Sequence, residues 1–184
     1  MAYFDYQLQR KQEIEETLLE LMLDTAYEQI SVKSLTDQLQ IARKTYYHYF
    51  SNKQACLESL MDRLILESNL QLIMLPENAA LYDVYACYMS FWIDHKVFLD
   101  AVIRNNLAPL FVKRMMLYLS HEDKNIQIQL NTAELSCDED VLFYYICGQV
   151  HLLLKWCSEG FTLTLDEMVR KILRLVHEPL LSRK

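Results

Sequence analysis

Glycine and proline are scarce in this chain of 184 residues, which holds 2 glycines and 3 prolines. Glycine reaches positive φ at little steric cost, so turns that need positive φ are expected to be few. The hairpins of a sheet-rich fold depend on such turns and are therefore disfavoured. Leu, Glu, Gln, Lys and Met, which are good helix formers, are abundant. The sequence predicts an all-α fold.

Apolar side chains recur at helical spacing along most of the chain and predict about nine helices. The first should cover roughly residues 8–28, and Ser31 should cap the second. A short helix over 43–49 should be followed by one from about Asn52 to just before Pro76. Further helices are expected around 84–92, from near Val97, from Pro109, from 136 to about 158 and from 164 onward, with 121–136 a loop containing some helix.

Three segments have the S/T-x-x-E/Q pattern of a capping box. In this arrangement a hydroxyl accepts from the N3 amide while the N3 side chain reaches back. The boxes begin at Ser51, Ser136 and Thr164. Gly160 is placed to end the long helix as its C′ residue.

One short segment is cationic and aromatic although the chain as a whole is acidic. With 18 Lys and Arg against 25 Asp and Glu, the formal net charge is −7, which argues against a general nucleic-acid coat. Yet residues 38–57 contain no acid, and within them lies ARKTYYHYFSNK, Ala42 to Lys53. Two short helices joined by about three or four residues, after a longer helix, describe a helix-turn-helix unit with 43–49 as its recognition helix.

The start of this recognition helix carries side chains that can read DNA. Arg43 suits a bidentate contact with guanine, and Thr45 suits an acceptor or a thymine methyl. Tyr47 and His48 can donate to phosphate oxygens. Lys53 opposes the dipole of the following helix, which suggests a phosphate partner there. The residues expected to contact DNA are Lys33, Arg43, Lys44, Thr45, Tyr46, Tyr47, His48 and Lys53.

The same window also allows a structural interpretation. Phe50 precedes a helix cap and is expected in the core as a hydrophobic staple. Tyr46 and Tyr49 could belong either to the core or to a DNA-facing surface. The charges could form an ordinary solvated face, so composition alone leaves DNA binding open.

Aromatic side chains are also frequent in the C-terminal region, where they could line a cavity for an apolar or aromatic effector. Alternatively they form the core, as aromatic stripes at helical spacing usually do. His151 lies in an apolar helix, where a hydrogen-bonded core or interface histidine is the simpler interpretation. The residues expected at a ligand pocket are Tyr85, Tyr88, Trp92, Tyr118, Tyr144 and His151.

Other classes of site find little support in the sequence. Five cysteines without CxxC spacing, and no signal peptide, indicate free thiols in a reducing cytosol. No His, Cys or acid group has metal-ligand spacing, and two glycines leave no phosphate loop or nucleophile elbow. The most apolar run, Val141 to Cys157, is too short and too polar for an easy membrane span. We expect no metal, no cofactor, no catalytic residue and no membrane partner.

The order of residues in SVKSLTDQLQIARKTYYHYFSNKQACLESL strongly resembles the DNA-binding segment of the TetR family of bacterial transcription regulators. The match covers about residues 14–60, and TYYHYFSNK is its most specific part. The segment FYYICGQVHLLLKWCSEGFTLTLDEMV resembles the last two helices of a subgroup that includes regulators of dihydroxyacetone-kinase operons. The resemblance implies a DNA-binding domain over 1–52 and a helical effector-binding and dimerisation domain over 53–184, which share the helix that begins near Asn52.

The resemblance also implies a homodimer on double-stranded operator DNA, controlled by a small-molecule effector. In the family the last two helices form a four-helix dimer interface. Gly148, in mid-helix, costs about 1 kcal/mol relative to Ala. Close approach of a partner helix, or an internal contact within one chain, would explain it. The residues expected at the dimer interface are Tyr145, Gly148, Leu152, Trp156, Met168, Ile172 and Leu175.

Two positions depart from the family's pattern. Its turn glycine is Gln40 here, and its serine cap of the recognition helix is Ala42. A Gln can make this turn if its backbone avoids positive φ, and the missing cap should cost about 1 kcal/mol. The leading hypothesis is a cytoplasmic, effector-responsive DNA-binding repressor. The alternative is a co-activator whose degenerate helix-turn-helix docks on another regulator.

Overall fold

The computed structural model describes residues 2–120 and 139–177, and within these ranges the chain is all-α, as predicted. No helix in these ranges is long and apolar enough to cross a membrane. The elements are α1 (Ala2–Asp24), the short 3₁₀ helix η1 (Tyr27–Gln29), α2 (Val32–Gln38), α3 (Arg43–Tyr49), α4 (Lys53–Ile73), α5 (Leu81–Asp94), α6 (Lys96–Arg104), α7 (Ala108–Ser120), α9 (Glu139–Ser158) and α10 (Leu165–His177).

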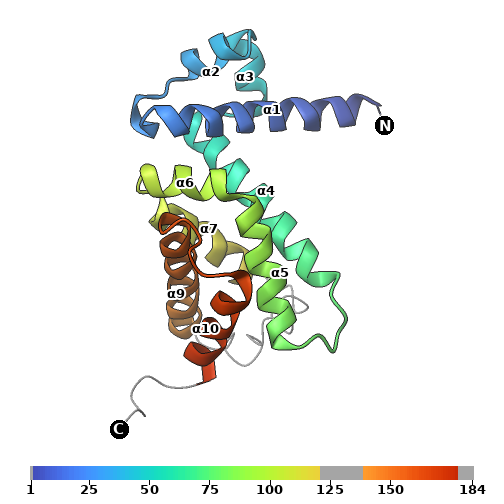
Figure 1. Cartoon of the computed structure of the whole chain (residues 1–184). Coiled ribbons are helices and arrows are strands. Elements are labelled where there is room, and N and C mark those ends of the chain that lie inside the picture. Colours follow the sequence, from blue (N-terminus) through green and yellow to red (C-terminus); the bar gives the residue numbers. More distant parts are fainter. Residues whose placement is uncertain (1, 121–138, 178–184) are drawn as a thin grey trace.

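The helices form a small N-terminal unit on a larger helical body (Figure 1). α1, α2 and α3 lie at one end, and α4 leaves that end to pack against α5 and α7. α9 packs against α6 and α7, while α10 packs against α5. One apolar core runs through both parts, from Ile14 on α1 through Leu57 and Leu60 on α4 to Trp92 and Ile172.

The first helix ends earlier than its sequence pattern predicts. It was expected to reach residue 28, but α1 stops at Asp24 and the chain continues as η1. The Tyr27 N–H donates to the Asn105 side-chain Oδ1 at 2.6 Å and is thereby taken from the helix ladder. A contact with a distant part of the chain thus overrides the local helical pattern.

The helix caps are partly as predicted. Ser31 caps α2 in a capping box with Ser34, and Thr164 forms the expected box with Glu167, whose Oε2 accepts from the Thr164 N–H at 2.8 Å. The box predicted at Ser51 is wrong. Asn52 caps α4 instead, because its Oδ1 accepts from the Ala55 N–H at 2.8 Å. The predicted box at 136–139 and the segment 121–136 lie outside the described residues, apart from the last residue of the box.

Three helices end on a residue in the left-handed region despite the shortage of glycine. Gly160, with φ +69°, is the C′ residue of α9, as predicted. The same position is taken by Gln40 after α2 and by Asn106 after α6. Gln40 thus makes the turn with positive φ, so the condition that a Gln there must avoid positive φ is wrong. An apolar residue follows each of the three and closes a Schellman bond. These bonds are Ile41 N to Thr36 O at 3.0 Å, Leu107 N to Val102 O at 2.9 Å and Phe161 N to Trp156 O at 2.9 Å.

Candidate nucleic-acid interface and ligand cavity

The recognition helix α3 has one buried face and one exposed polar face. Tyr46 and Phe50, four residues apart, point into the core, and the Tyr46 hydroxyl donates to the Asn52 carbonyl at 3.2 Å. Tyr46 is fully buried, so the structure contradicts its expected contact with DNA. Its anchor to the core leaves the opposite side of α3 turned outward.

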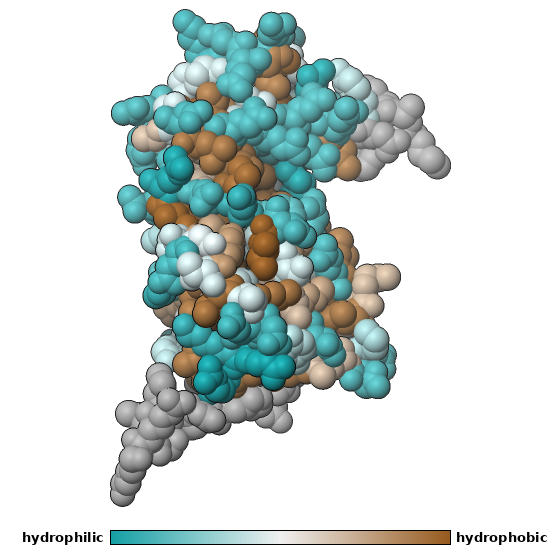
Figure 2. All heavy atoms as spheres, in the orientation of Figure 1, coloured by the Kyte–Doolittle hydropathy of each residue, from teal (hydrophilic) through white to brown (hydrophobic). Residues whose placement is uncertain are grey.

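The exposed face of α3 consists of residues at positions i, i+1, i+4 and i+5. Arg43, Lys44 and His48 are exposed, and Tyr47 has an exposed fraction of 54%. Neither Arg43 nor Lys44 forms a salt bridge with any residue that the structure describes. Figure 2 shows hydrophilic residues over most of this end of the molecule on the face drawn. We call Arg43, Lys44, Tyr47 and His48 the α3 face.

Two further expected DNA contacts flank the α3 face. Thr45 is half-buried, and Lys33 is exposed on α2. The N-cap of α3 is Ala42, which makes no side-chain capping bond. The first amides of α3 thus have no capping side chain.

Lys53 lies differently from its expected place against phosphate. Its ammonium donates to the backbone carbonyls of Ile30, at 2.7 Å, and of Tyr27, and lies 4.1 Å from the centroid of the Tyr27 ring. Partial burial lowers the pKa of Lys53. These contacts hold η1 and the residue that follows it against α4, so Lys53 positions the helix-turn-helix unit rather than extending toward a ligand.

Some of the acids of α1 are paired within the protein. Glu13 pairs with Arg10 at 2.8 Å. Glu15 is buried and accepts from Arg63 Nε at 2.8 Å and from Ser59 Oγ at 2.7 Å. The formal acidity of the N-terminal segment is therefore partly neutralised by cations of α1 and α4.

The N-terminal unit is fastened to the helical body at the end of α6. Asn105 is buried, and its Nδ2 donates to Met22 O at 3.2 Å and to Ala101 O at 2.8 Å, while its Oδ1 accepts from Tyr27 N–H. Arg104 adds a more exposed bond to Leu23 O at 3.0 Å. One buried amide thus ties the end of α1 and the start of η1 to α6.

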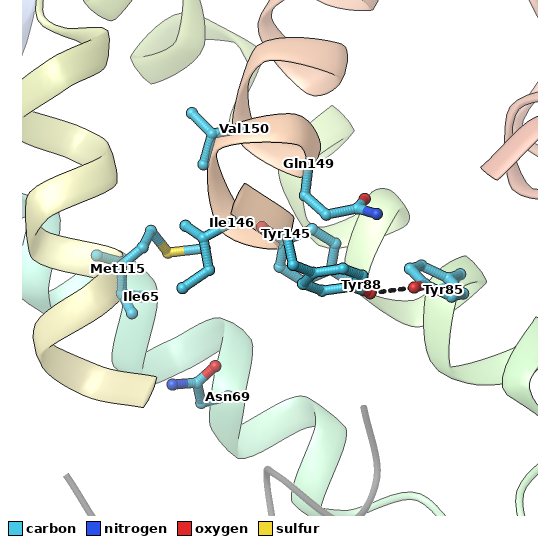
Figure 3. A pocket seen from close by; sticks show the side chains of 9 residues that line it. All are labelled: Ile65, Asn69, Tyr85, Tyr88, Met115, Tyr145, Ile146, Gln149 and Val150. Carbon is cyan, nitrogen blue, oxygen red and sulfur yellow. Dashed lines mark hydrogen bonds between the residues drawn. The ribbon is translucent and has the colours of Figure 1, made fainter. Parts of the chain in front are cut away.

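A cavity lies among α4, α5, α7 and α9 in the helical body (Figure 3). Its volume is about 30 Å³. A single water needs roughly 10–15 Å³, so the cavity has room for about two or three waters. The side chains that line it are those of Ile65, Asn69, Tyr85, Tyr88, Met115, Tyr145, Ile146, Gln149 and Val150.

The cavity wall is uncharged and mostly apolar, with a few polar groups. The hydroxyls of Tyr85 on α5 and Tyr145 on α9 hydrogen-bond to each other (Figure 3). Burial raises the pKa of Tyr85, Tyr88 and Tyr145, so all three stay neutral near pH 7. The side-chain Oε1 of Gln149 is buried and has no hydrogen-bond partner within the described chain.

Of the six residues expected at a pocket, Tyr85 and Tyr88 line the cavity and four lie elsewhere. Trp92 is fully buried among Phe91, Phe98 and Phe111, so it belongs to the core. Tyr118 is half-buried on α7 outside the lining. The two residues on α9 also lie outside the cavity lining. Tyr144 has an exposed fraction of 80%, and the exposed His151 bonds through Nδ1 to Cys147 O at 2.7 Å.

Sequence reasoning missed most of the lining. It counted Tyr145 among the aromatic side chains that could line a cavity but assigned it to the dimer interface. It did not single out Asn69 or Gln149 for a pocket, although both interrupt apolar stripes of their helices. A polar residue within an apolar stripe was the sequence feature that could have indicated a pocket residue. The apolar lining residues cannot be told apart from core residues by their sequence. They are Ile65, Met115, Ile146 and Val150.

The residues expected at a dimer interface fall into three groups. Trp156, Met168 and Ile172 are buried within the protomer, and Trp156 Nε1 donates to Leu163 O at 3.1 Å, so these three are core residues. Tyr145 and Leu152 are half-buried. Gly148 and Leu175 are exposed, with Leu175 at 46%.

The absence of a side chain at Gly148 has no explanation among the described residues of the protomer. A methyl group placed there would meet no atom of the described chain within 4 Å. The alternative of a close internal contact is therefore wrong for the residues described. A close neighbour outside the protomer remains as an explanation.

Comparisons with known proteins give distant matches. No family model matches the chain. The HTH-type transcriptional regulator EthR of Mycobacterium tuberculosis is 38% identical over 60 residues, which is 33% of this chain and 28% of that protein. EthR of Mycobacterium bovis matches to the same extent. The match thus spans little more than a quarter of these relatives' length.

Solved structures match over most of the chain. The fatty acid degradation regulator FadR of Bacillus halodurans has a TM-score of 0.61 at 14% identity, covering 92% of this chain and 98% of that one. The dihydroxyacetone kinase operon activator DhaS has a TM-score of 0.57 at 17% identity, covering 90% and 93%. A TetR-family transcriptional regulator of Haemophilus influenzae, HI0893, has 0.52 at 17% identity, covering 92% and 97%. At these identities the likeness establishes the fold.

Proposed function

We infer from the TetR-family fold of this chain, the fold that its sequence led us to expect, that it is a DNA-binding transcriptional regulator. The observation that carries this proposal is the α3 face. Arg43, Lys44, Tyr47 and His48 point outward together, while Tyr46 and Phe50 fix the helix from behind. The similar proteins are named as transcriptional regulators, a fatty acid degradation regulator and an operon activator, and none is named as an enzyme.

On operator DNA, α3 enters the major groove with its N-terminal end first. Arg43 and Thr45 approach base edges there, and Lys44, Tyr47 and His48 bind phosphates on either side. Lys33 on α2 contacts the neighbouring phosphate backbone. Lys53 acts indirectly, because its bonds to the carbonyls of Tyr27 in η1 and Ile30 after it set the orientation of the unit.

The proposed active form is a homodimer built through α9 and α10, which places two α3 helices in successive major grooves. Gly148 and Leu175, exposed on these helices, and the half-buried Leu152 are available for that contact. The three interface candidates that proved to be core support α9 and α10 from within. The proposed dimer acts in the cytoplasm, where its operator lies.

The proposed regulation is a population shift. A small molecule in the cavity among α4, α5, α7 and α9 favours a dimer whose α3 helices are wrongly spaced, so operator affinity falls. α4 joins the cavity wall at Ile65 and Asn69 to the DNA-binding unit at Lys53. In this scheme the protein is a repressor released by its effector.

The experiment that tests DNA binding is an anisotropy titration of the purified protein against its own upstream region at two salt concentrations. A sequence-selective complex that weakens steeply with salt supports a DNA reader, since phosphate contacts release counterions. A well-folded dimer that binds no upstream fragment would overturn the proposal. The co-activator alternative, docking on another regulator, would then take its place.

A further inference from the structure

The cavity among α4, α5, α7 and α9 has a wall chemistry that restricts what can occupy it. The inference rests on the proposed function only in treating this cavity as the effector site. None of the nine lining side chains is Asp, Glu, Lys, Arg or His. A charged ligand would lose its hydration without gaining an opposite charge, which costs several kcal/mol.

A charged pair next to the cavity is already satisfied by its own partners. Arg114 on α7 makes a bidentate pair with Asp62 on α4, with Arg114 Nε at 2.6 Å from Asp62 Oδ1. Neither residue belongs to the cavity lining. The neutral tyrosines Tyr85, Tyr88 and Tyr145 add no charge to the wall. The cavity therefore disfavours both anions and cations.

Gln149 adds a directional preference to this neutral wall. Buried side-chain acceptors in folded proteins are nearly always hydrogen-bonded. Gln149 belongs to the cavity lining, and its Oε1 is buried without a partner among the described residues. Figure 3 shows the Gln149 side chain extending from α9 over the tyrosines of the wall. A ligand with an O–H or N–H group would satisfy this oxygen.

We propose that the cavity binds a small uncharged molecule with an apolar body and one hydrogen-bond donor, which donates to Gln149 Oε1. The volume of about 30 Å³ limits an occupant of the present cavity to a few non-hydrogen atoms. A larger ligand of the same chemistry enters only when the Tyr85–Tyr145 hydrogen bond between α5 and α9 opens.

Three probes of matched size separate the chemical classes. Propan-2-ol donates and accepts, acetone accepts only, and acetate is charged. Each is titrated into the full-length protein without DNA, and methyl resonances of Ile65 and Ile146 report occupation of the cavity by NMR. We expect propan-2-ol to bind about fivefold more tightly than acetone, the ratio that one ordinary hydrogen bond gives. Acetate should cause no shift at these methyl groups.

Two variants test whether Gln149 Oε1 causes the preference for propan-2-ol over acetone. Gln149→Leu should abolish the difference between propan-2-ol and acetone while leaving both able to bind. Gln71→Leu makes the same chemical change at an exposed site on α4 and should keep the wild-type ratio. If wild-type protein binds acetone as tightly as propan-2-ol, binds acetate at these methyl groups, or takes up no probe, the proposal is overturned.

Failure of probe binding at the cavity can be distinguished from failure of DNA binding. Because the titration contains no DNA, loss of operator binding cannot mimic a failure at the cavity. Conversely, a protein that discriminates the probes as expected but binds no upstream DNA would keep the cavity chemistry and lose the role as a DNA reader.

Discussion

Gln40 ends α2 with a φ of +53°, a conformation that costs a residue with a Cβ about 1–2 kcal/mol. Replacing it by Gly removes this strain but adds the larger entropy of an unfolded glycine, about 0.5–1 kcal/mol. We therefore expect Gln40→Gly to raise the free energy of unfolding by about 0.5–1 kcal/mol, measured by urea denaturation.

The control for this substitution is Gln38→Gly, two residues earlier at the last helical residue of α2. There the backbone is helical, so glycine should destabilise by about 1 kcal/mol. If both variants lose stability, the left-handed turn at Gln40 is not strained and the argument fails.

Substitutions on the α3 face should affect DNA binding, whereas substitution of Lys53 should affect the stability of the binding unit. Arg43→Ala and Lys44→Ala should each lower operator affinity about tenfold, and a lost phosphate contact should reduce the salt slope by about 1. Lys53→Met should lower thermal stability, because two carbonyls lose their ammonium partner, with little change in the slope. Anisotropy titrations over a range of salt concentrations distinguish these effects. Unchanged affinity in both α3 variants would remove this face from the site.

How far the site could be predicted from the sequence differs from residue to residue. The bounds of α3 and the inward position of Phe50 follow from local spacing, and the structure has both. The same spacing pairs Tyr46 with Phe50, so the burial of Tyr46 could also have been predicted. The role of Lys53 could not be predicted, because its partners at Tyr27 and Ile30 meet it only after α1 and α4 have packed together.

Thr164 and Glu167 start α10 with a capping box that local sequence alone predicts. The Thr164 N–H and hydroxyl lower the pKa of Glu167 below its ordinary value. A lowered pKa stabilises the fold above the pKa of the unfolded chain, about 4.3, and this contribution disappears as the pH falls through the folded value.

We expect Thr164→Ala to lower the free energy of unfolding at neutral pH by about 1 kcal/mol, as for other lost caps. The deficit relative to wild type should shrink as the solution is acidified below about pH 4. Circular dichroism melts of both proteins at a series of pH values would measure this difference in stability. A deficit that is independent of pH would show that the carboxylate does not take part in the cap.

α9 demonstrates why the orientation of a helix is harder to predict than its bounds. Its run of apolar residues has no continuous polar stripe to mark an outer face. Tyr144 and Tyr145 are therefore equivalent in the sequence, yet one is mostly exposed and the other lines the cavity. Only packing against α6 and α7 decides between them.

Gly148 on α9 provides a test of helix-to-helix contact between protomers. Gly148→Leu should stabilise the isolated helix by up to about 1 kcal/mol, since a Cβ placed there meets no atom of the described chain within 4 Å. If a partner helix packs there, the bulky side chain should raise the dimer dissociation constant at least about tenfold, seen by light scattering after size exclusion. Gly148→Ala should have a smaller effect. An undisturbed dimer in Gly148→Leu would place the interface elsewhere.

At the scale of the whole molecule, Asn105 connects the two parts. Asn105→Ala leaves the Tyr27 N–H and the Met22 carbonyl without their partner, and loss of buried hydrogen bonds should cost about 2–3 kcal/mol of unfolding free energy. Hydrogen exchange of the Tyr27 amide should accelerate at the same time. Arg104→Gln, which removes the exposed bond to Leu23, serves as the control and should cost well under about 1 kcal/mol. Equal effects of the two variants would contradict a special role for the buried amide.

α4 belongs to both halves of the protein, and this limits how its parts can be recombined. A cut between residues 52 and 53 would deprive the DNA-binding unit of Lys53, of the buried Leu57 and of Arg63, the partner of Glu15. The DNA-binding unit is therefore not expected to fold or to be transferable without α4. A chimaera that grafts this reader onto another sensor, in the laboratory or in evolution, must inherit α4 at least as far as Arg63 together with it.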